Sequence, residues 1–550
     1  MRKPQQTRIL DRCVPGFDPL SLSNLSTKKT SIDKPTKKLS PRVFRLVGAV
    51  LSACTTDYCS YGVTAYNSDI MTGLIQEKYS PIAKENALAG NLTGGCRYIT
   101  LAEKLVARKN ALLLGAVFFI LTAGALAQVP ANYFGMTMSA TDSQEPYPPA
   151  SIASIRLWNT GTDWAEMNPA AGVYDFSRFD MWLSEAANHN LSVLYTFGRT
   201  PVWASADPKM GCHGNPAGQC APPKDLDADG SGPDQIWKDF VTAIVNHNQQ
   251  SSTGHVSYWE IWNEPNAIGN WQGTMAQTVR MAADAYNIIK EIDPSATVTS
   301  PAPTGEWKPD GKHTAAALWM QQYLAAGGLS YVDIFSFHTY VWAPNSIPVA
   351  EEVVPLIKSV KQVIAAYHSS SVPMWSTEGS FGASLNGDEG IGDPDLRAAF
   401  TARFLLLQYS AGLQRFYWFA WDSAPPEGFG TMWTWDQSSG CTSPYGGGYL
   451  CGTGIAYQQI TDWMIGARLT KYCLQGTQTS RWTCQFSRSG GYVAEAIWDP
   501  AQTCKNSSCA VEWVSVPDQF ISYRDLAGNK YSISKGLVPV GAKPILLENQ

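Results

Sequence analysis

The sequence predicts an α/β chain: a (β/α)8 barrel, the TIM-barrel architecture, followed by a small C-terminal β-sandwich domain. From Val129 to about Ala467, eight short apolar segments alternate with amphipathic stretches of helical period, which is typical of a parallel sheet wrapped by helices. Beyond Ala467 the apolar period changes to two, and turns rich in Gly, Asn and Pro separate the segments. A length of 550 residues also exceeds what one hydrophobic core supports, so two or more domains are expected.

The N-terminal region differs in charge from the rest of the chain. Residues 1–110 carry 17 Lys and Arg against 8 Asp and Glu, whereas the remainder carries 24 against 38. We expect residues 1–105 to be a poorly structured or spurious extension, because they show no sustained periodicity. One explanation is that translation begins near Leu105 or Val106. The acidic remainder argues against a nucleic-acid partner, which would need a basic face.

Residues 106–127 have the three parts of a signal peptide. Arg108 and Lys109 precede a 17-residue apolar run, and Ala125-Leu-Ala127 stands directly before Gln128. A signal anchor with a basic cytoplasmic tail is the alternative, although 17 residues are few for a membrane span. We therefore expect a secreted or periplasmic protein. In the alternative, the chain is membrane-anchored through 111–127 with its folded domains outside the cytoplasm.

The barrel is predicted over residues 128–467. Its expected strands are Tyr133–Thr137, Ile152–Leu157, Ser192–Phe197, Ser257–Trp262, Thr297–Pro301, Ile334–Tyr340, Pro373–Thr377 and Arg415–Ala420. Its expected helices include Phe179–Asn188, Ile236–Asn248, Met275–Ile292, Ala315–Leu324, Val353–Ala366 and Asp395–Tyr409. Eight strand–helix units in this length fit a closed barrel, whose active site lies at the C-terminal ends of the strands.

The β-sandwich is predicted over residues 468–550. Its expected strands are Arg481–Phe486, Tyr492–Trp498, Ala510–Val516, Phe520–Arg524, Tyr531–Ile533 and Pro544–Glu548. This domain contains no constellation of catalytic residues, so a structural, accessory role is expected for it.

Eight cysteines follow residue 128 and form four local pairs in the sequence. The pairs are Cys212 with Cys220, Cys441 with Cys451, Cys473 with Cys484, and Cys504 with Cys509. An even count at hairpin-like spacing is the pattern of disulfides formed in an oxidising compartment, which supports export independently of the signal peptide. The spacings match no zinc motif, so no metal site is expected from them.

Two glutamates stand where predicted barrel strands end. Glu264 follows strand four in Tyr258-Trp-Glu-Ile-Trp-Asn-Glu-Pro-Asn266, and Glu378 ends strand seven in Val372-Pro-Met-Trp-Ser-Thr-Glu378. Cleaving an acetal requires one carboxylic acid and one carboxylate in different surroundings. The pair therefore predicts glycoside hydrolysis, with Glu264 as acid/base and Glu378 as nucleophile. Glu260 competes for the acid role, but its depth in the strand favours a buried hydrogen-bonding residue.

The segment Trp262-Asn-Glu-Pro-Asn266 resembles the acid/base motif of glycoside hydrolase clan A. That clan has its acid/base after strand four and its nucleophile after strand seven. The motif is most similar to family 39, with family 5 as a more distant relative, and the resemblance covers residues 129–467. It implies a retaining β-glycosidase that works by double displacement.

The resemblance also implies roles for other residues at strand ends. Asn263 matches the residue that hydrogen-bonds the sugar 2-hydroxyl, and Arg156 matches the one that helps hold the nucleophile ionised. Tyr340 matches the residue that orients the nucleophile, and His338 is implied to face the site. Trp421 is similar to the platform under the sugar that is cleaved.

Two departures from the family patterns leave the sugar unassigned. Strand three ends in Tyr195-Thr-Phe-Gly-Arg-Thr-Pro-Val-Trp203, without the His that family 5 enzymes carry there, and Trp203 is a further candidate for substrate contact. Arg156 is followed by Leu157-Trp158, whereas family 39 xylosidases often have His after this Arg. A xylose substrate therefore does not follow from the motifs.

The segment Asp225-Leu-Asp-Ala-Asp-Gly230 copies the first half of a calcium loop. Ile236 occupies the twelfth position, where a calcium loop needs a bidentate Glu, so we expect an acidic, solvated turn. The glutamate pair itself needs neither metal nor cofactor. The expected partner is a carbohydrate, and membrane contact is expected only if 111–127 is uncleaved.

The sequence as a whole predicts an exported hydrolase that cleaves β-glycosidic bonds of a polysaccharide or oligosaccharide. A secreted carbohydrate-binding protein on an inactive barrel is the alternative from another class; the carboxylate pair weighs against it, because binding alone needs no such pair. A transglycosidase using the same residues with a sugar acceptor in place of water is a second alternative. For the β-sandwich, carbohydrate binding is the alternative to a structural role.

Overall fold

The computed structural model describes residues 127–138, 145–305, 311–312, 314–341, 347–382, 391–422, 430–438, 440–506 and 508–550. All of them belong to one compact unit, Val117–Gln550. The expectations for residues 1–105 and for the segment 106–126 lie outside the described residues. Within the described ranges, no helix has the length and apolar character needed to cross a membrane.

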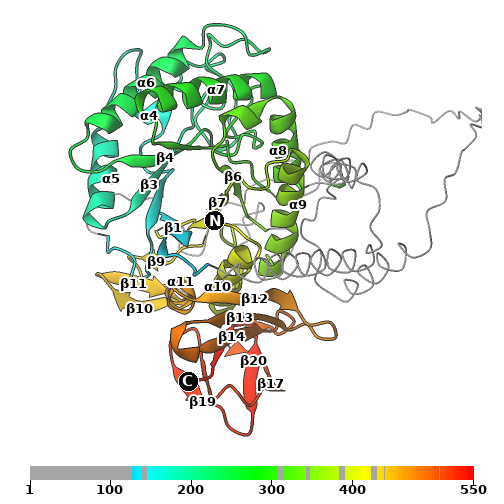
Figure 1. The fold of residues 1–550 in the computed structure, drawn as a ribbon. Coiled ribbons are helices and arrows are strands. Elements are labelled where there is room, and N and C mark those ends of the chain that lie inside the picture. The colour runs from blue at the N-terminus through cyan, green and yellow to red at the C-terminus, as the bar shows by residue number, and fades with distance from the viewer. Residues whose placement is uncertain are drawn as a thin grey trace, which may run out of the picture. The chain divides into compact units, whose positions relative to one another are not determined.

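Eight parallel strands form the predicted barrel (Figure 1). They are β1 (Phe134–Thr137), β2 (Ser154–Leu157), β3 (Ser192–Thr196), β4 (Val256–Glu260), β5 (Thr297–Thr299), β6 (Phe335–His338), β7 (Met374–Glu378) and β8 (Arg415–Trp418). Their order in the sheet is β5-β4-β3-β2-β1-β8-β7-β6, and a parallel bridge between Thr299 and Ile334 closes the sheet. Most strand residues are buried, because side chains fill the interior and helices cover the outside.

Several of the helices that follow the strands begin at residues whose side chains satisfy free backbone amides. They are α4 (Trp164–Met167), α5 (Ser177–Asn188), α6 (Gln235–Gln250), α7 (Met275–Ile292), α8 (Ala315–Ala325), α9 (Val353–Ala366) and α10 (Pro394–Ser410). Thr274 and Gln277 form a reciprocal capping box at the start of α7. Asp393 caps α10, whose first residue is Pro394. Short 3-10 helices occur at Ala131–Tyr133, Gly328–Tyr331, Ala350–Glu352 and Ser489–Gly491.

The segment Asp225–Gly230, which is similar to a calcium loop, caps helix α6 and contacts Arg280 of α7. Asp225 Oδ2 accepts hydrogen bonds from the first two amides of α6, at 2.7 and 3.1 Å. The Nη1 of Arg280 donates to the backbone carbonyls of Gly230 and Gly232, both at 3.2 Å. The exposed side chains of Asp227 and Asp229 fit the expected acidic, solvated turn.

One small sheet and two helices within residues 128–467, α4 and a helix that follows the sheet, were not predicted. The sheet consists of β9 (Trp433–Thr434), β10 (Cys441–Tyr445) and β11 (Gly448–Cys451), and α11 (Gly452–Met464) follows it. The strands are short, and Cys441 pairs with Cys451 in the β10–β11 register as well as through a disulfide. Gly446 and Gly447 both have positive φ, as the two central residues of a type I′ hairpin turn require. This covalent and turn geometry, rather than apolar periodicity, defines the sheet.

The C-terminal part forms the predicted β-sandwich. Its six-stranded antiparallel sheet has the order β12 (Arg468–Gln475), β13 (Trp482–Ser487), β14 (Val493–Trp498), β21 (Ile545–Glu548), β18 (Ser522–Arg524) and β19 (Lys530–Ser532). A ribbon of β17 (Val511–Ser515) and β20 (Leu537–Gly541) covers one face, and a hairpin joins β15 (Cys504–Lys505) to β16 (Ser508–Cys509). The core between the layers contains Ile497, Ile545 and Leu547 from the sheet with Val538 and Val540 from the ribbon. Strands β12 and β20 were not predicted from the sequence.

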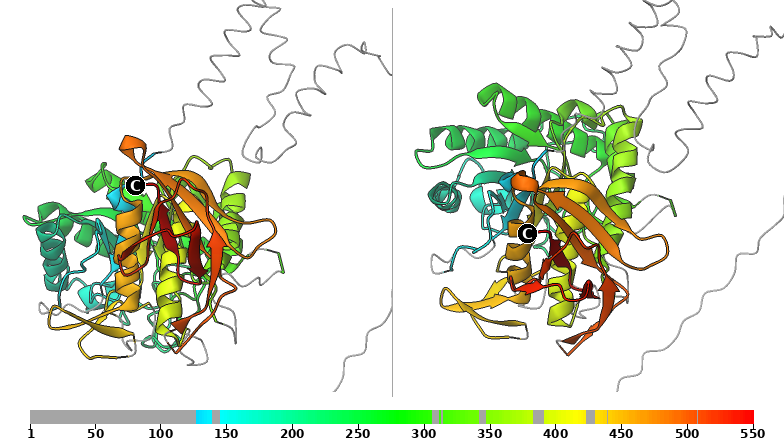
Figure 2. Two further views of the ribbon diagram at one scale, coloured as in Figure 1. Left: turned by 90° about the horizontal axis from the view of Figure 1, so that it is seen from below. Right: turned by 60° about the horizontal axis from the view of Figure 1, so that its bottom comes forward.

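The other face of the six-stranded sheet packs against α10 and α11 (Figure 2). The backbone amide of Cys473 in β12 donates to Ser410 Oγ at the end of α10, at 2.7 Å. Trp498 Nε1 in β14 donates to Glu351 Oε1, at 2.7 Å. Lys543 pairs with Asp395 of α10 at 2.9 Å. The sandwich therefore packs on the helices that surround the barrel.

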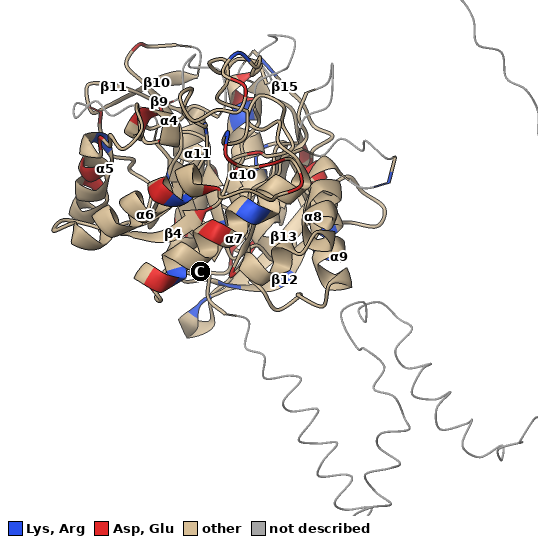
Figure 3. Ribbon diagram, turned by 90° about the horizontal axis from the view of Figure 1, so that it is seen from above, with Lys and Arg blue, Asp and Glu red and all other residues tan. Residues whose placement is uncertain are grey.

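All four predicted disulfides are present and confirmed: Cys212–Cys220, Cys441–Cys451, Cys473–Cys484 and Cys504–Cys509. They fit an extracellular enzyme, since such bonds persist in oxidising compartments. In the view of Figure 3, acidic and basic positions are interspersed along the helices and loops.

Candidate active site

Both predicted catalytic glutamates lie at the C-terminal ends of barrel strands. Glu378 is the last residue of β7, and Glu264 lies in the loop that follows β4. Glu264 has a φ of 44°, in the left-handed region that non-glycine residues rarely adopt. Its amide donates to the carbonyl of Ala302 at 3.0 Å, and its carbonyl accepts from Ala267 at 2.9 Å. Tertiary contacts thus hold the loop in a conformation that is locally unfavourable.

Two donors hold the Glu378 carboxylate. Arg156 Nη1 binds its Oε2 at 2.5 Å, and the Tyr340 hydroxyl donates to its Oε1 at 2.7 Å. Burial, followed by the charge of Glu378, raises the pKa of Tyr340 well above its usual value, so this phenol stays protonated and donates. Donors to both oxygens fix the orientation of this carboxylate.

Arg156 joins three strands of the barrel interior. Its Nε and Nη2 donate to Glu260 Oε1 at 3.0 and 2.7 Å, and Nη2 also donates to Asn263 Oδ1 at 2.7 Å. Burial lowers the pKa of Arg156, but the charges of Glu260 and Glu378 outweigh burial and raise it. Glu260 is fully buried and also accepts from Thr196 at 3.0 Å. It therefore has the buried hydrogen-bonding position expected for it, since breaking such a pair would leave a buried charge without a partner.

His338 contacts the other glutamate. Its Nδ1 lies 2.8 Å from Glu264 Oε1, and its Nε2 lies 3.4 Å from Arg156 Nη2. A guanidinium only donates, so Nε2 accepts and the ring proton lies on Nδ1, directed at Glu264. Burial raises the pKa of Glu264, but the hydrogen bond from His338, a hydrogen bond from Thr304 and the charge of Arg156 bring it below its ordinary value. The side chain of Glu264 is 18% exposed, against 9% for Glu378.

The two carboxylates and His338 converge. Glu264, His338 and Glu378 each provide one atom such that the three atoms lie within 4.8 Å of one another; among the described residues they are the group able to surround a metal ion. The guanidinium of Arg156 already supplies a positive charge to Glu378 and contacts His338. The arrangement therefore suits proton transfer and attack between two closely spaced carboxyl groups.

Sequence reasoning missed the loop residue Asn270 and the contact between Trp158 and Phe419. Asn270 Nδ2 donates to Glu264 Oε2 at 3.2 Å, and it follows Glu264 in the same loop. Trp158, Phe419 and Ala420 form a small buried cluster, with the guanidinium of Arg156 6.0 Å from the Trp158 ring centroid. The proximity of Phe419 to Trp158 is a tertiary contact, which periodicity in the sequence does not reveal.

The two tryptophans predicted to contact substrate, Trp421 and Trp203, pack against other groups of the protein. Trp421 is 1% exposed, and its ring stacks on Trp433 with 6.2 Å between centroids. Trp203 is partly buried; its indole N–H donates to the carbonyl of Asn168 at 2.8 Å, and Lys224 lies over the ring. In this structure both rings pack against protein, and their roles toward a sugar stay predictions.

Comparisons with known proteins point to one enzyme class. A family model described as "Glycosyl hydrolase catalytic core" matches residues 234–446. No curated protein matches the sequence. Among solved structures, a family 39 glycoside hydrolase from the gut symbiont Bacteroides cellulosilyticus WH2 matches with a TM-score of 0.53 and 16% identity, covering 76% of this chain and 80% of that one.

Two structures from Caulobacter crescentus are similarly close. A monomeric beta-xylosidase from strain CB15 has a TM-score of 0.53 and 17% identity, over 78% of this chain and 97% of that one. A GH39 beta-xylosidase has a TM-score of 0.51 and 18% identity, over 77% and 97%. At these identities the structural likeness shows the fold. Together with the family model, the matches support a glycosidase function and confirm that this chain resembles the clan A-like glycoside hydrolases, with family 39 proteins among its structural relatives.

Proposed function

We propose that this protein is an exported retaining β-glycosidase that acts on a polysaccharide or oligosaccharide, with Glu264 as acid/base and Glu378 as nucleophile. The observation that carries the proposal is the spacing of the two carboxyl groups, which have oxygens within 4.8 Å of each other at the ends of β4 and β7. Retaining enzymes have about 5–5.5 Å between their carboxyl groups, whereas inverting enzymes need about 6.5–9.5 Å to admit a water molecule.

The surroundings of the two carboxyl groups support different roles for them. Glu378 has a full positive charge and a phenolic donor on its two oxygens, and it lies at the end of a strand. Glu264 is more exposed than Glu378, and its Oε1 lies 2.8 Å from the Nδ1 of the buried His338. A nucleophile needs a fixed, ionised carboxylate, whereas an acid/base must gain and lose a proton in each cycle.

The proposed reaction has two displacements at the anomeric carbon. First, Glu264 gives its proton to the glycosidic oxygen, a Glu378 oxygen bonds to the anomeric carbon, and the bond to the leaving group breaks. Then Glu264 takes a proton from water, the water oxygen bonds to the anomeric carbon, and the ester bond to Glu378 breaks. Two inversions give net retention, and both glutamates return to their starting states.

The other predicted residues receive supporting roles in this proposal. Because Asn263 Oδ1 accepts from Arg156, its amide N–H group is the part available to donate to a sugar 2-hydroxyl. Tyr340 and Arg156 position Glu378, while Trp421 and Trp203 remain candidates for sugar contact. Residues 128–467 form the catalytic barrel in this proposal, and residues 468–550 form an accessory domain that packs on its helices.

The test is hydrolysis of aryl β-glycosides and β-linked polysaccharides, with β-xylosides included because two structural relatives are named beta-xylosidases. We expect the wild-type protein to release product whose first-formed anomer is β, as read by NMR. First-formed α product would show inversion and contradict the proposal. Binding of a polysaccharide with no turnover across the panel would instead favour a carbohydrate-binding protein.

A further inference from the structure

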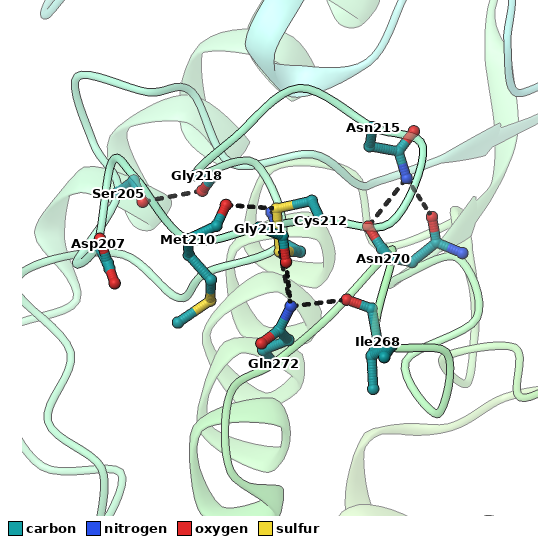
Figure 4. Close-up of a disulfide and its surroundings, with 12 residues drawn as sticks. Ser205, Asp207, Met210, Gly211, Cys212, Asn215, Gly218, Ile268, Asn270 and Gln272 are labelled. Atoms are coloured by element: carbon teal, nitrogen blue, oxygen red, sulfur yellow. Dashed lines mark hydrogen bonds between the residues drawn. A yellow bond between two sulfur atoms is a disulfide. The ribbon is translucent and has the colours of Figure 1, made fainter. Parts of the chain in front are cut away.

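The loop that carries Glu264 is joined to a second loop that a disulfide closes. Cys212–Cys220 pins the segment between them, which belongs to the long connection from β3 to α6 (Figure 4). Gln272 links the two loops: its amide donates to the Cys220 carbonyl at 2.7 Å, and its side chain donates to the carbonyls of Gly211 and Ile268 at 2.7 and 2.9 Å. These contacts join the loops without touching Glu264.

A second set of contacts runs from the disulfide loop to Glu264 itself. Asn215 Nδ2 donates to the backbone carbonyl of Gly269 at 2.9 Å and to Asn270 Oδ1 at 3.2 Å (Figure 4). Asn270 Nδ2 then donates to Glu264 Oε2 at 3.2 Å. The indole N–H of Trp262 holds the backbone carbonyl of Asn270 at 3.1 Å.

The chemistry of these groups fixes the direction of every hydrogen bond. A backbone carbonyl only accepts, so the contact with Gly269 requires Asn215 to present its NH2 group to both partners. Asn270 must then present its oxygen to Asn215, which turns its own NH2 group toward Glu264. A flipped Asn270 would direct an oxygen at a carboxylate and an NH2 group at another NH2 group, and both contacts would be repulsive.

We propose that Asn270 is a positioning residue for the acid/base Glu264, and that Asn215 and the Cys212–Cys220 loop set the orientation of its amide. This inference rests on the proposed function. The amide orients Glu264 Oε2, while His338 holds Oε1, so the carboxyl group is fixed at both oxygens although its backbone lies in a loop. The amide also stabilises the ionised form, which Glu264 needs when it deprotonates water.

The pH dependence of the reaction measures the effect of the contact between Asn270 and Glu264. The titratable or charged groups that face Glu264 are His338 from β6, Glu378 from β7 and Arg156 from β2. The basic limb of kcat/KM marks the loss of the Glu264 proton. Removing a donor to the carboxylate moves that limb to higher pH, and placing a negative charge there moves it further.

The experiment compares four single variants with the wild-type enzyme on an aryl β-glycoside with a poor leaving group. Asn270→Ala removes the donor; Asn270→Asp keeps the shape but replaces the donor with an anion. Asn215→Ala frees the amide to flip. Gln272→Ala is the matched control, because Gln272 lies in the same loop and bridges to the same disulfide loop without contacting Glu264.

We expect Asn270→Ala to lower kcat/KM by about 10- to 100-fold, the effect of losing a hydrogen bond to a charged group. Its basic limb shifts to higher pH, and that of Asn270→Asp shifts further. Asn215→Ala shifts it in the same direction by less, and the Asn215→Ala, Asn270→Ala double variant behaves like Asn270→Ala alone, because the two residues act through one contact. Gln272→Ala keeps the wild-type profile.

The inference is overturned if Asn270→Ala and Asn270→Asp keep the wild-type pH profile, or if Gln272→Ala shifts it as they do. Loss of folding in one variant leaves the others decisive, since Asn270→Asp is isosteric. A Cys212→Ser, Cys220→Ser double variant gives a second measurement, with a shift in the direction of Asn215→Ala expected. Wild-type protein and Glu264→Gln are assayed in parallel: if these two do not differ, the proposed function has failed rather than this inference.

Discussion

The two halves of the candidate active site are built in different ways. Glu378 ends a barrel strand and is held by Arg156 and Tyr340, which lie at or just beyond the ends of other strands. Glu264 lies in a loop with a left-handed φ and is held by His338 and by the loop residue Asn270. In the proposed mechanism, a barrel strand therefore carries the group that must stay ionised, whereas a loop carries the group that must change its protonation state.

The strand-built half should tolerate change least. We expect Glu378→Gln to lower kcat by about 10⁴-fold or more on every substrate, because no covalent intermediate can form without the carboxylate. Thermal unfolding and circular dichroism check that the variant folds. A rate within about tenfold of the wild type would show that Glu378 is not the nucleophile.

The loop-built half should show a loss that depends on the substrate. Glu264→Gln should lower kcat/KM by about 10²–10⁴-fold for a poor leaving group, the usual contribution of general acid catalysis. Activated aryl glycosides, which leave without protonation, should lose far less in the first displacement. Equal losses across a series of leaving groups would contradict the acid role of Glu264.

His338 should tune the pH dependence of the loop-built half. The pKa of Glu264 lies below its ordinary value because contacts with His338 and others outweigh its burial. The acid form is lost as pH rises through this lowered pKa, so the basic limb of kcat/KM is expected on the acidic side. His338→Ala removes the main donor and should move that limb to higher pH. A limb that stays in place would mean that His338 does not control Glu264.

The long connection from β3 to α6 should also make the stability of the protein depend on pH. Burial, and then Asp284 beside it, raise the pKa of Asp234 at the start of α6 to about 8. An unfolded aspartate has a pKa near 3.9, so stability from the bound proton is present below about pH 4 and is lost as pH rises toward 8.

Asp234→Asn removes this titration, and Asn tolerates the left-handed φ of 48° at this position. Between pH 5 and pH 8, the melting temperature of the variant should fall less than that of the wild type, by about 2–4 °C. Parallel declines in the two proteins would show that Asp234 does not titrate in this range.

The same contrast separates the features that could be predicted from the sequence from those that could not. Apolar period and strand–helix alternation located all eight barrel strands to within a few residues, and the end of strand seven located Glu378. The resemblance to clan A implied Arg156 and His338, which lie near the ends of other strands. Local cysteine spacing gave the four disulfides. These features depend on residues close in sequence or on one rule of barrel geometry.

The loops could not be predicted in the same way. Asn215 and Asn270 are 55 positions apart, and neither belongs to a motif, so only the folded loops reveal their contact. The sheet of β9, β10 and β11 depends on a disulfide and glycine turns, and strand β20 is stabilised by pairing with β17. Trp421 matched a family position, but its ring packs on Trp433, a neighbour that the motif does not include.

Azide rescue of two alanine variants tests the central claim most directly, because it distinguishes the two glutamates by the stereochemistry of the product. With Glu378→Ala, azide should attack the anomeric carbon directly and give the α-glycosyl azide. With Glu264→Ala, azide should attack the glycosyl-enzyme on Glu378 and give the β-glycosyl azide. The reverse pairing of products, or no rescue of either variant on an activated substrate, would contradict the assignment of Glu378 as nucleophile and Glu264 as acid/base.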